Sequence, residues 1–195
     1  MWACFVNIDL LKFSSYESPS TDGSSARITG DNILETMKLQ LDDTAAFLAD
    51  ITEERSLYRY APDKWSIRQV VNHVNDTERV FAFRAMWFAR GFSDPLPSFD
   101  QDVSSEASRA DERPLANHSQ EFRNIREASL SLFRNLPAEA WGRSGIASGN
   151  SVTVNALAYI IAGRAPYGHP SQALPAKLTA ANIFQIALAV CDCRA

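Results

Sequence analysis

Apolar residues recur every three or four positions in four stretches of the chain, which is the spacing of one face of an α-helix. The predicted helices cover residues 31–51, 66–90 and 114–136, and a fourth begins near residue 153. Each connection between them contains Pro or Gly, so residues 52–65, 92–113 and 137–152 are predicted to be loops. The pattern predicts an all-α protein with a single core.

Local capping signals mark where two of these helices begin. Ser66 and Gln69 form a capping box, in which the hydroxyl accepts from the backbone N–H of residue 69 and the Gln side chain reaches back. Trp65 and Val70 have the spacing of the hydrophobic staple that accompanies such a box. Thr153 has the side chain of a helix N-cap. Two of the four helices therefore have predicted starting residues.

Composition narrows the class of protein. The 195 residues are 46% hydrophobic and 22% charged, which is typical of one globular domain. The net charge of −4 does not favour nucleic acid, whose binding depends on basic surface, and no apolar run approaches the roughly 20 residues that span a bilayer. The odd count of three cysteines, at 4, 191 and 193, does not indicate a disulfide framework, and the N-terminus lacks the basic start that is typical of a signal peptide. The expected location is cytoplasmic.

His73 is the main candidate for chemistry. On the predicted helix it lies at the edge of the apolar stripe, with Asp76 and Thr77 one turn further along on the same side. An imidazole that faces a bundle and has a carboxylate nearby is typical of a metal ligand, and Asp76 is expected to orient the ring. A half-buried histidine that only hydrogen-bonds its neighbours fits the same pattern.

Three other residues have side chains that could take part. Glu78 falls inside the apolar stripe, where a buried carboxylate is costly unless it is paired. It could support a metal ligand or accept a proton, but an ion pair with an arginine of a neighbouring helix, such as Arg126, is favoured. His118 occupies a stripe position and is interpreted as packing. His169 lies between Gly and Pro and is expected in irregular chain.

Several runs of residues, taken together and in order, resemble the DinB-like (DinB/YfiT) superfamily. The resemblance covers about residues 28–163 and rests on the order and spacing of the runs. They are YAPDKWS at 60–66, HVNDTER at 73–79, FRA at 83–85, PSFDQD at 97–102, EFR at 121–123 with Arg126, Trp141, VTV at 152–154 and AYIIAG at 158–163.

This resemblance implies an up-down-down-up four-helix bundle that is often a homodimer. It implies a divalent metal, zinc or nickel, held by a histidine at the position of His73 and by a His-x-x-x-His pattern directly after Gly163. Asp76 and Glu78 would contact the ligand His73 and support it without binding the metal themselves. The implied activity is a transferase- or hydrolase-type reaction on a small molecule, in some relatives with a low-molecular-weight thiol. The metal would lower the pKa of a bound water or thiol.

The sequence departs from the superfamily pattern at the two other ligands. Arg164 and Gly168 stand at those positions, and His169 is one residue out of register. We therefore expect an atypical lead-in over residues 1–27, a bundle over 28–170 whose last helix is truncated or distorted, and an atypical tail over 171–195. The expected function is a metal-dependent activity with an incomplete site. The alternative is a metal-free scaffold for dimerisation or partner binding.

The abrupt end of the resemblance at Gly163 predicts a frameshift in the gene. Codons that encode residues 164–175, read from their second base, permit Gly-His-His-Thr-Ala-Ile-Leu-Arg-Lys-Arg-Tyr-Leu. That string resembles the usual ending of the superfamily. A gradual loss of function would change the ligands and keep the helical pattern around them, whereas here the pattern itself is lost.

Overall fold

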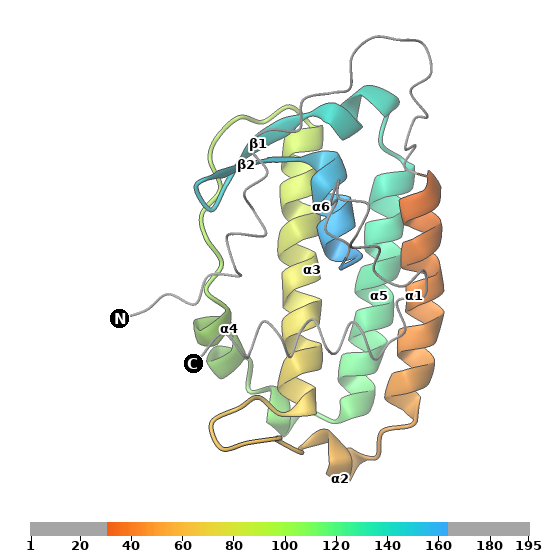
Figure 1. Cartoon of the computed structure of the whole chain (residues 1–195), viewed down its shortest axis with the longest axis vertical. Helices are drawn as coiled ribbons and strands as arrows, with labels where there is room; N and C mark the ends of the chain where they lie inside the picture. Colours follow the sequence, from red (N-terminus) through yellow and green to blue (C-terminus); the bar gives the residue numbers. More distant parts are fainter. Residues whose placement is uncertain (1–30, 164–195) are drawn as a thin grey trace, which may run out of the picture.

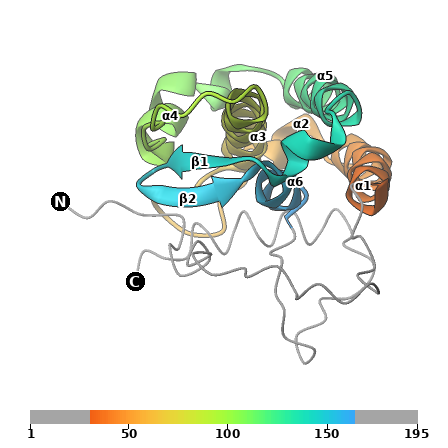
Figure 2. The same cartoon turned by 90° about the horizontal axis from the view of Figure 1, so that it is seen from above.

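Four helices lie side by side along one axis in the computed structural model, which describes residues 31–163 (Figures 1 and 2). They are α1 (Asp31–Ala49), α3 (Ile67–Ala89), α5 (Leu115–Arg134) and α6 (Val154–Ile161). The predicted four-helix bundle is therefore confirmed. Among the helices of this region, none combines the length and the apolar character needed to cross a membrane.

The bundle has the predicted up-down-down-up order. In Figure 1, α3 and α5 run in one direction, and α1 and α6 run in the other. Two adjacent parallel helices need a long return connection, and residues 90–114 supply it. This connection descends along α3 and carries the short helix α4 (Gln101–Ser108) and a 3₁₀ turn at Ala110–Glu112. A second short helix, α2 (Glu53–Ser56), joins α1 to α3.

The predicted helix starts are confirmed. The Ser66 hydroxyl accepts from the Gln69 backbone N–H at 3.1 Å, and the Gln69 side chain accepts from the Ser66 N–H at 3.0 Å. α3 continues from this cap to Ala89 and is followed by Gly91, whose φ of +88° favours glycine. Thr153 caps α6 by accepting from the Ala156 N–H at 3.0 Å.

The core consists of two apolar clusters that are separated by polar side chains. The larger cluster contains Ile33, Met37, Phe88, Phe133 and Leu157 among others, and the smaller contains Leu48, Val71 and Leu115. Along each long helix a buried polar residue lies between the two, and these residues are Gln40, Glu78 and Arg126. In α6, Val154 and Leu157 are buried as predicted, but Ile160 and Ile161 are only half-buried.

Two of the predicted loops contain short α-helices. α4 lies in the predicted loop 92–113, where the Asp100 carboxylate accepts from the backbone N–H groups of Asp102 and Val103. Only Gln101 and Ser105 of this helix are buried, so it has no apolar stripe to detect. The predicted loop 52–65 contains α2, which is too short to show a helical period.

The third predicted loop forms an antiparallel hairpin of β1 (Ser144–Ala147) and β2 (Asn150–Thr153). Its turn residues Ser148 and Gly149 have φ values of +53° and +78°, as a tight hairpin turn requires. The hairpin packs closely on α3, because a Cβ added to Gly145 would lie 2.1 Å from the Phe88 ring. Only Ala147 is buried in either strand, so no apolar alternation marks them in the sequence.

Candidate functional site

His73 is held inside the bundle wall by the start of α3. The capping box fixes the first turn of the helix, and His73 follows two turns later with 8% of its surface exposed. The Trp65 ring lies against it, with ring centroids 5.0 Å apart and planes tilted by 55°. Thr77 Oγ1 lies 3.4 Å from each of the two ring nitrogens. This distance is at the upper limit for a hydrogen bond. The imidazole is thus positioned mainly by packing.

The protonation state of His73 follows from this burial. Desolvation lowers the pKa of the imidazole below its ordinary value of 6.5, while the carboxylates of Asp76 and Asp102 act in the opposite direction. The ring is therefore neutral at pH 7. The neutral form is the one that binds a metal ion or accepts a proton.

Asp76 does not hydrogen-bond to the imidazole among the described contacts, contrary to the prediction that it orients the ring. Its Oδ2 accepts from Asn72 Nδ2 at 2.9 Å and from Ser104 Oγ at 3.2 Å, and Oδ1 accepts from Arg79 at 3.3 Å. A short carboxylate side chain is held by the amide one turn earlier and by the neighbouring α4. Asp76 consequently joins α3 to α4 and acts on His73 through its charge.

Glu78 forms the predicted ion pair with Arg126. Arg126 donates from Nε and Nη2 to the carboxylate at 2.9–3.1 Å, and both side chains are almost fully buried. Arg126 also donates to Gln40 Oε1 at 3.2 Å and to the Met37 carbonyl at 3.4 Å. The carboxylate is engaged by a neighbouring helix, and a position five residues after His73 lies on a different side of α3.

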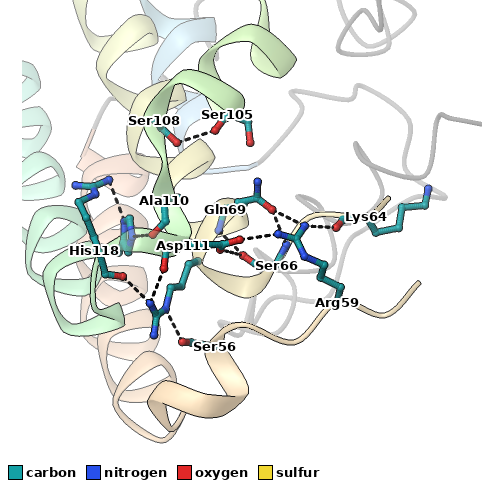
Figure 3. A network of polar contacts seen from close by, with 12 residues as sticks. Ser56, Arg59, Lys64, Ser66, Gln69, Ser105, Ser108, Ala110, Asp111 and His118 are labelled. Atoms are coloured by element: carbon teal, nitrogen blue, oxygen red, sulfur yellow. Dashed lines mark hydrogen bonds and ion pairs between the residues drawn. The ribbon is translucent and has the colours of Figure 1, made fainter. Parts of the chain in front are cut away.

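His118 is packed inside the structure, as predicted, and is completely buried. Its Nε2 donates to the Ala110 carbonyl at 2.9 Å, and Arg113 lies 3.3 Å from Nδ1 (Figure 3). Asn75 Nδ2 donates to the His118 carbonyl at 3.1 Å. This histidine therefore joins α5 to α3 and to the 3₁₀ turn, and it does not reach His73 as a ligand.

Asp111 organises the lower end of the site, although the sequence did not single it out. The carboxylate accepts from the Ser66 hydroxyl and, at 2.6 Å, from Arg59 Nη2, as Figure 3 shows. Arg59 also donates to Gln69 Oε1 at 2.7 Å. The capping box that places His73 is thus tied to the connection before α5. A carboxylate in a predicted loop carries no signal of such a contact.

α4 contributes two further buried polar groups beside α3. Gln101 Oε1 and Ser105 Oγ are buried without a hydrogen-bond partner in the described structure. The helix is positioned near His73 by the bond from Ser104 to Asp76 and by the effect of Asp102 on the imidazole pKa. The sequence missed these residues because α4 was predicted to be a loop.

Comparison with known proteins identifies the family. A model of the DinB superfamily matches residues 36–163. The chain belongs to the DinB superfamily. A comparison with curated protein sequences found no significant match.

Two solved structures share the fold of this DinB chain. YfiT from Bacillus subtilis, described as "a probable metal-dependent hydrolase with an unusual four-helix bundle topology", superposes with a TM-score of 0.65 at 13% identity. The match covers 88% of this chain and 90% of that one. A mycothiol-dependent maleylpyruvate isomerase matches with a TM-score of 0.59 at 10% identity, over 68% of this chain and 56% of that one. At these identities the likeness establishes the fold alone.

The described part of the DinB chain contains one side chain whose chemistry suits a metal ligand. A neutral, buried imidazole at position 73 fits a divalent ion. Within residues 31–163, however, no three His, Cys, Asp or Glu side chains are placed together to hold a metal. Arg164, Gly168 and His169 lie outside the described residues. The donor set described here therefore does not fit a complete three-ligand site.

Proposed function

We propose that this DinB chain carries a small-molecule site centred on His73, which is the retained ligand of an incomplete zinc or nickel site. The observation that supports the proposal is a neutral imidazole, 8% exposed, on the helix that carries the superfamily motif. The description of YfiT as a probable metal-dependent hydrolase supports a metal-dependent reaction on a small molecule as the ancestral activity. With one suitable ligand among residues 31–163, this chain would bind the metal weakly and turn over slowly or not at all.

The proposal extends to partners and organisation. The mycothiol dependence of one structural relative supports a low-molecular-weight thiol as the co-substrate. We further propose a cytoplasmic homodimer, in which residues 28–170 form the functional domain between an atypical lead-in at 1–27 and an atypical tail at 171–195. Size-exclusion chromatography with light scattering tests the oligomeric state directly.

A metal-free scaffold is the second candidate, and the buried Arg126 cluster favours it. Arg126 reaches carboxylate, amide and carbonyl oxygens from α3 and α1, and its Nη2 lies 3.5 Å from the Ile161 carbonyl of α6. Helices α1, α3, α5 and α6 are thus joined through contacts of one side chain. A bundle held in this way is able to persist after its metal chemistry has been lost.

Metal titration separates the two candidates. Purified full-length protein is titrated with zinc and with nickel by calorimetry, alongside His73→Ala and, as a control for the other described histidine, His118→Asn. Circular dichroism verifies that each variant is folded. Loss of a group that merely supports a ligand lowers metal affinity about 10–100-fold, so a site lacking two ligands is expected to be weaker by at least roughly 100-fold than a complete one.

The outcomes are distinct. Weak binding that disappears in His73→Ala and persists in His118→Asn supports the incomplete site. Binding that does not depend on His73 leaves the scaffold as the better interpretation. Tight stoichiometric binding that depends on His73 contradicts the proposal of an incomplete site, because residues outside 31–163 would then complete it.

A further inference from the structure

Three arginine residues in the described part of the chain are buried, and one of them lacks an acidic partner. Arg68 pairs with Glu53 at 2.5 Å, and Arg126 pairs with Glu78 at 2.9 Å. Arg84 is 7% exposed, yet no carboxylate of residues 31–163 lies within 4.0 Å of it. A buried guanidinium without a counter-ion is unfavourable, because it loses hydration and gains no opposite charge.

The contacts of Arg84 use only part of its guanidinium. Nη2 donates to the Pro97 carbonyl at 2.8 Å and to Ser148 Oγ at 3.1 Å. The guanidinium carbon also lies 5.5 Å from the centre of the Phe81 ring. Nε and Nη1 donate to no group in the described structure, and neither is among the fully buried nitrogens that lack a partner. Both therefore keep hydrogen-bonding capacity that the described contacts do not use.

The surroundings hold this guanidinium in place. Pro97 lies in the connection before α4, and Ser148 lies in the turn of the β-hairpin. Leu96 joins these two segments, since its N–H donates to the Ile146 carbonyl at 2.9 Å and its carbonyl accepts from the Ser148 N–H at 3.1 Å. The two segments that position Arg84 are thus bonded to each other. A donor fixed in this way loses little freedom when it binds an anion.

Arg84 also lies on the His73 side of α3. The two residues are eleven positions apart, which is close to three helical turns and about 16 Å along the axis. Side chains on a helix lean toward its N-terminus, and His73 lies in that direction from Arg84. A small molecule bound at one end by Arg84 would run along the same face of α3 as the imidazole.

We propose that Arg84 binds the oxyanion of the small-molecule ligand, a carboxylate or a phosphate, through Nε and Nη1. Guanidinium N–H groups match both oxyanions in geometry and charge. The identification of this anion with the substrate rests on the proposed function of the His73 site. Anion binding at Arg84 itself does not depend on any metal.

The first test is a titration of the full-length protein observed through the arginine Nε–H resonances in ¹⁵N-correlated NMR spectra. Inorganic phosphate and acetate are added separately at constant ionic strength, and Arg84→Lys assigns the signal. We expect a saturable shift of the Arg84 Nε–H and none at Arg126, whose Nε is bonded to Glu78. Saturation by phosphate alone identifies a phosphate ligand, and saturation by acetate identifies a carboxylate. An unchanged Arg84 signal, or equal drift at all arginines, overturns the proposal.

The second test uses thermal stability, because a ligand that binds the native state raises the melting temperature. The anion that saturates the NMR signal should raise the melting temperature of the unmodified protein. The anion affinity should fall roughly 10- to 100-fold in Arg84→Met, as expected for the loss of charged hydrogen bonds. An equal anion effect in Arg84→Met contradicts the proposal. If this variant does not fold, the NMR titration of the unmodified protein still decides.

His73→Ala separates this inference from the proposed function. The imidazole lies about three turns away, so the variant should keep the anion response of Arg84. An anion response that persists in a protein with no His73-dependent metal binding supports the Arg84 site and removes only the metal proposal. Loss of the response in a folded His73→Ala protein contradicts an anion site formed by Arg84.

Discussion

Replacement of Arg126 by Met should destabilise the protein more than most other single substitutions. Arg126 and Glu78 are 2% and 3% exposed, and their ion pair is bidentate, with N–O distances of 2.9–3.1 Å. The substitution leaves the Glu78 carboxylate buried without its partner. Removing one member of a buried pair lowers the free energy of unfolding by about 3–5 kcal/mol. For a chain of this size, that corresponds to a fall in melting temperature of roughly 6–20 °C.

The measurement is urea and thermal unfolding followed by circular dichroism, with Arg134→Met as the matched control. Arg134 lies on the same helix with its side chain exposed, so its replacement should change the free energy of unfolding by less than about 0.5 kcal/mol. A loss of less than about 1 kcal/mol in Arg126→Met would refute the reasoning, since such a value is typical of a pair that solvent reaches.

The double variant Glu78→Leu with Arg126→Met tests whether the unpaired charge is the cause. Removal of both charges should restore most of the lost stability, because a buried ion pair replaced by apolar residues is often neutral or stabilising. If the double variant is as unstable as the sum of the single ones, the bonds from Arg126 to Gln40 and to the Met37 carbonyl carry the stability instead.

Three further predictions concern other parts of the chain. Gly145→Ala should lower the free energy of unfolding by about 1–3 kcal/mol, because its Cβ would overlap the Phe88 ring, whereas Gly142→Ala, with open space around it, should be neutral in the same unfolding assay. Desolvation lowers the pKa of His118 below 6.5, so the unfolded state binds more protons than the native state at lower pH. The contribution of His118 to the free energy of unfolding should therefore be fully present above pH 6.5 and decrease as the pH falls below it. Unfolding measured as a function of pH should show a smaller decrease for His118→Asn. Sequencing of the gene around codon 164 should find that the frame beginning at the second base encodes the His-His run; a different shifted reading would disprove the frameshift.

Features that depend on neighbouring residues could be predicted from the sequence. The start of α3 follows from Ser66 and Gln69, which satisfy each other's backbone groups within one turn. The start of α6 follows from Thr153 in the same way. The pairing of Glu78 was also predictable, because a carboxylate inside an apolar stripe requires a buried partner on a facing helix.

The arrangement around the candidate site depended on contacts between distant segments. The position of His73 was read from the helical period, but its burial depends on Trp65 and its electrostatic environment on Asp102 of α4. Asp76 was predicted to orient the imidazole because of their spacing along the helix, whereas in the structure its carboxylate accepts a hydrogen bond from Ser104 of α4. Spacing along a helix places side chains on one side and does not select among the partners that another segment brings there.

Arg84 illustrates this limit most clearly. The sequence by itself determined that it lies on a helix, about three turns after His73 and on the same face. Only the tertiary structure decided that the connection before α4 and the hairpin turn would meet there and bury the guanidinium against Pro97 and Ser148. Local sequence indicates the long amphipathic helices and the face on which a residue lies, because those depend on helix geometry. Whether a charge is buried or paired depends on which distant segments pack against it.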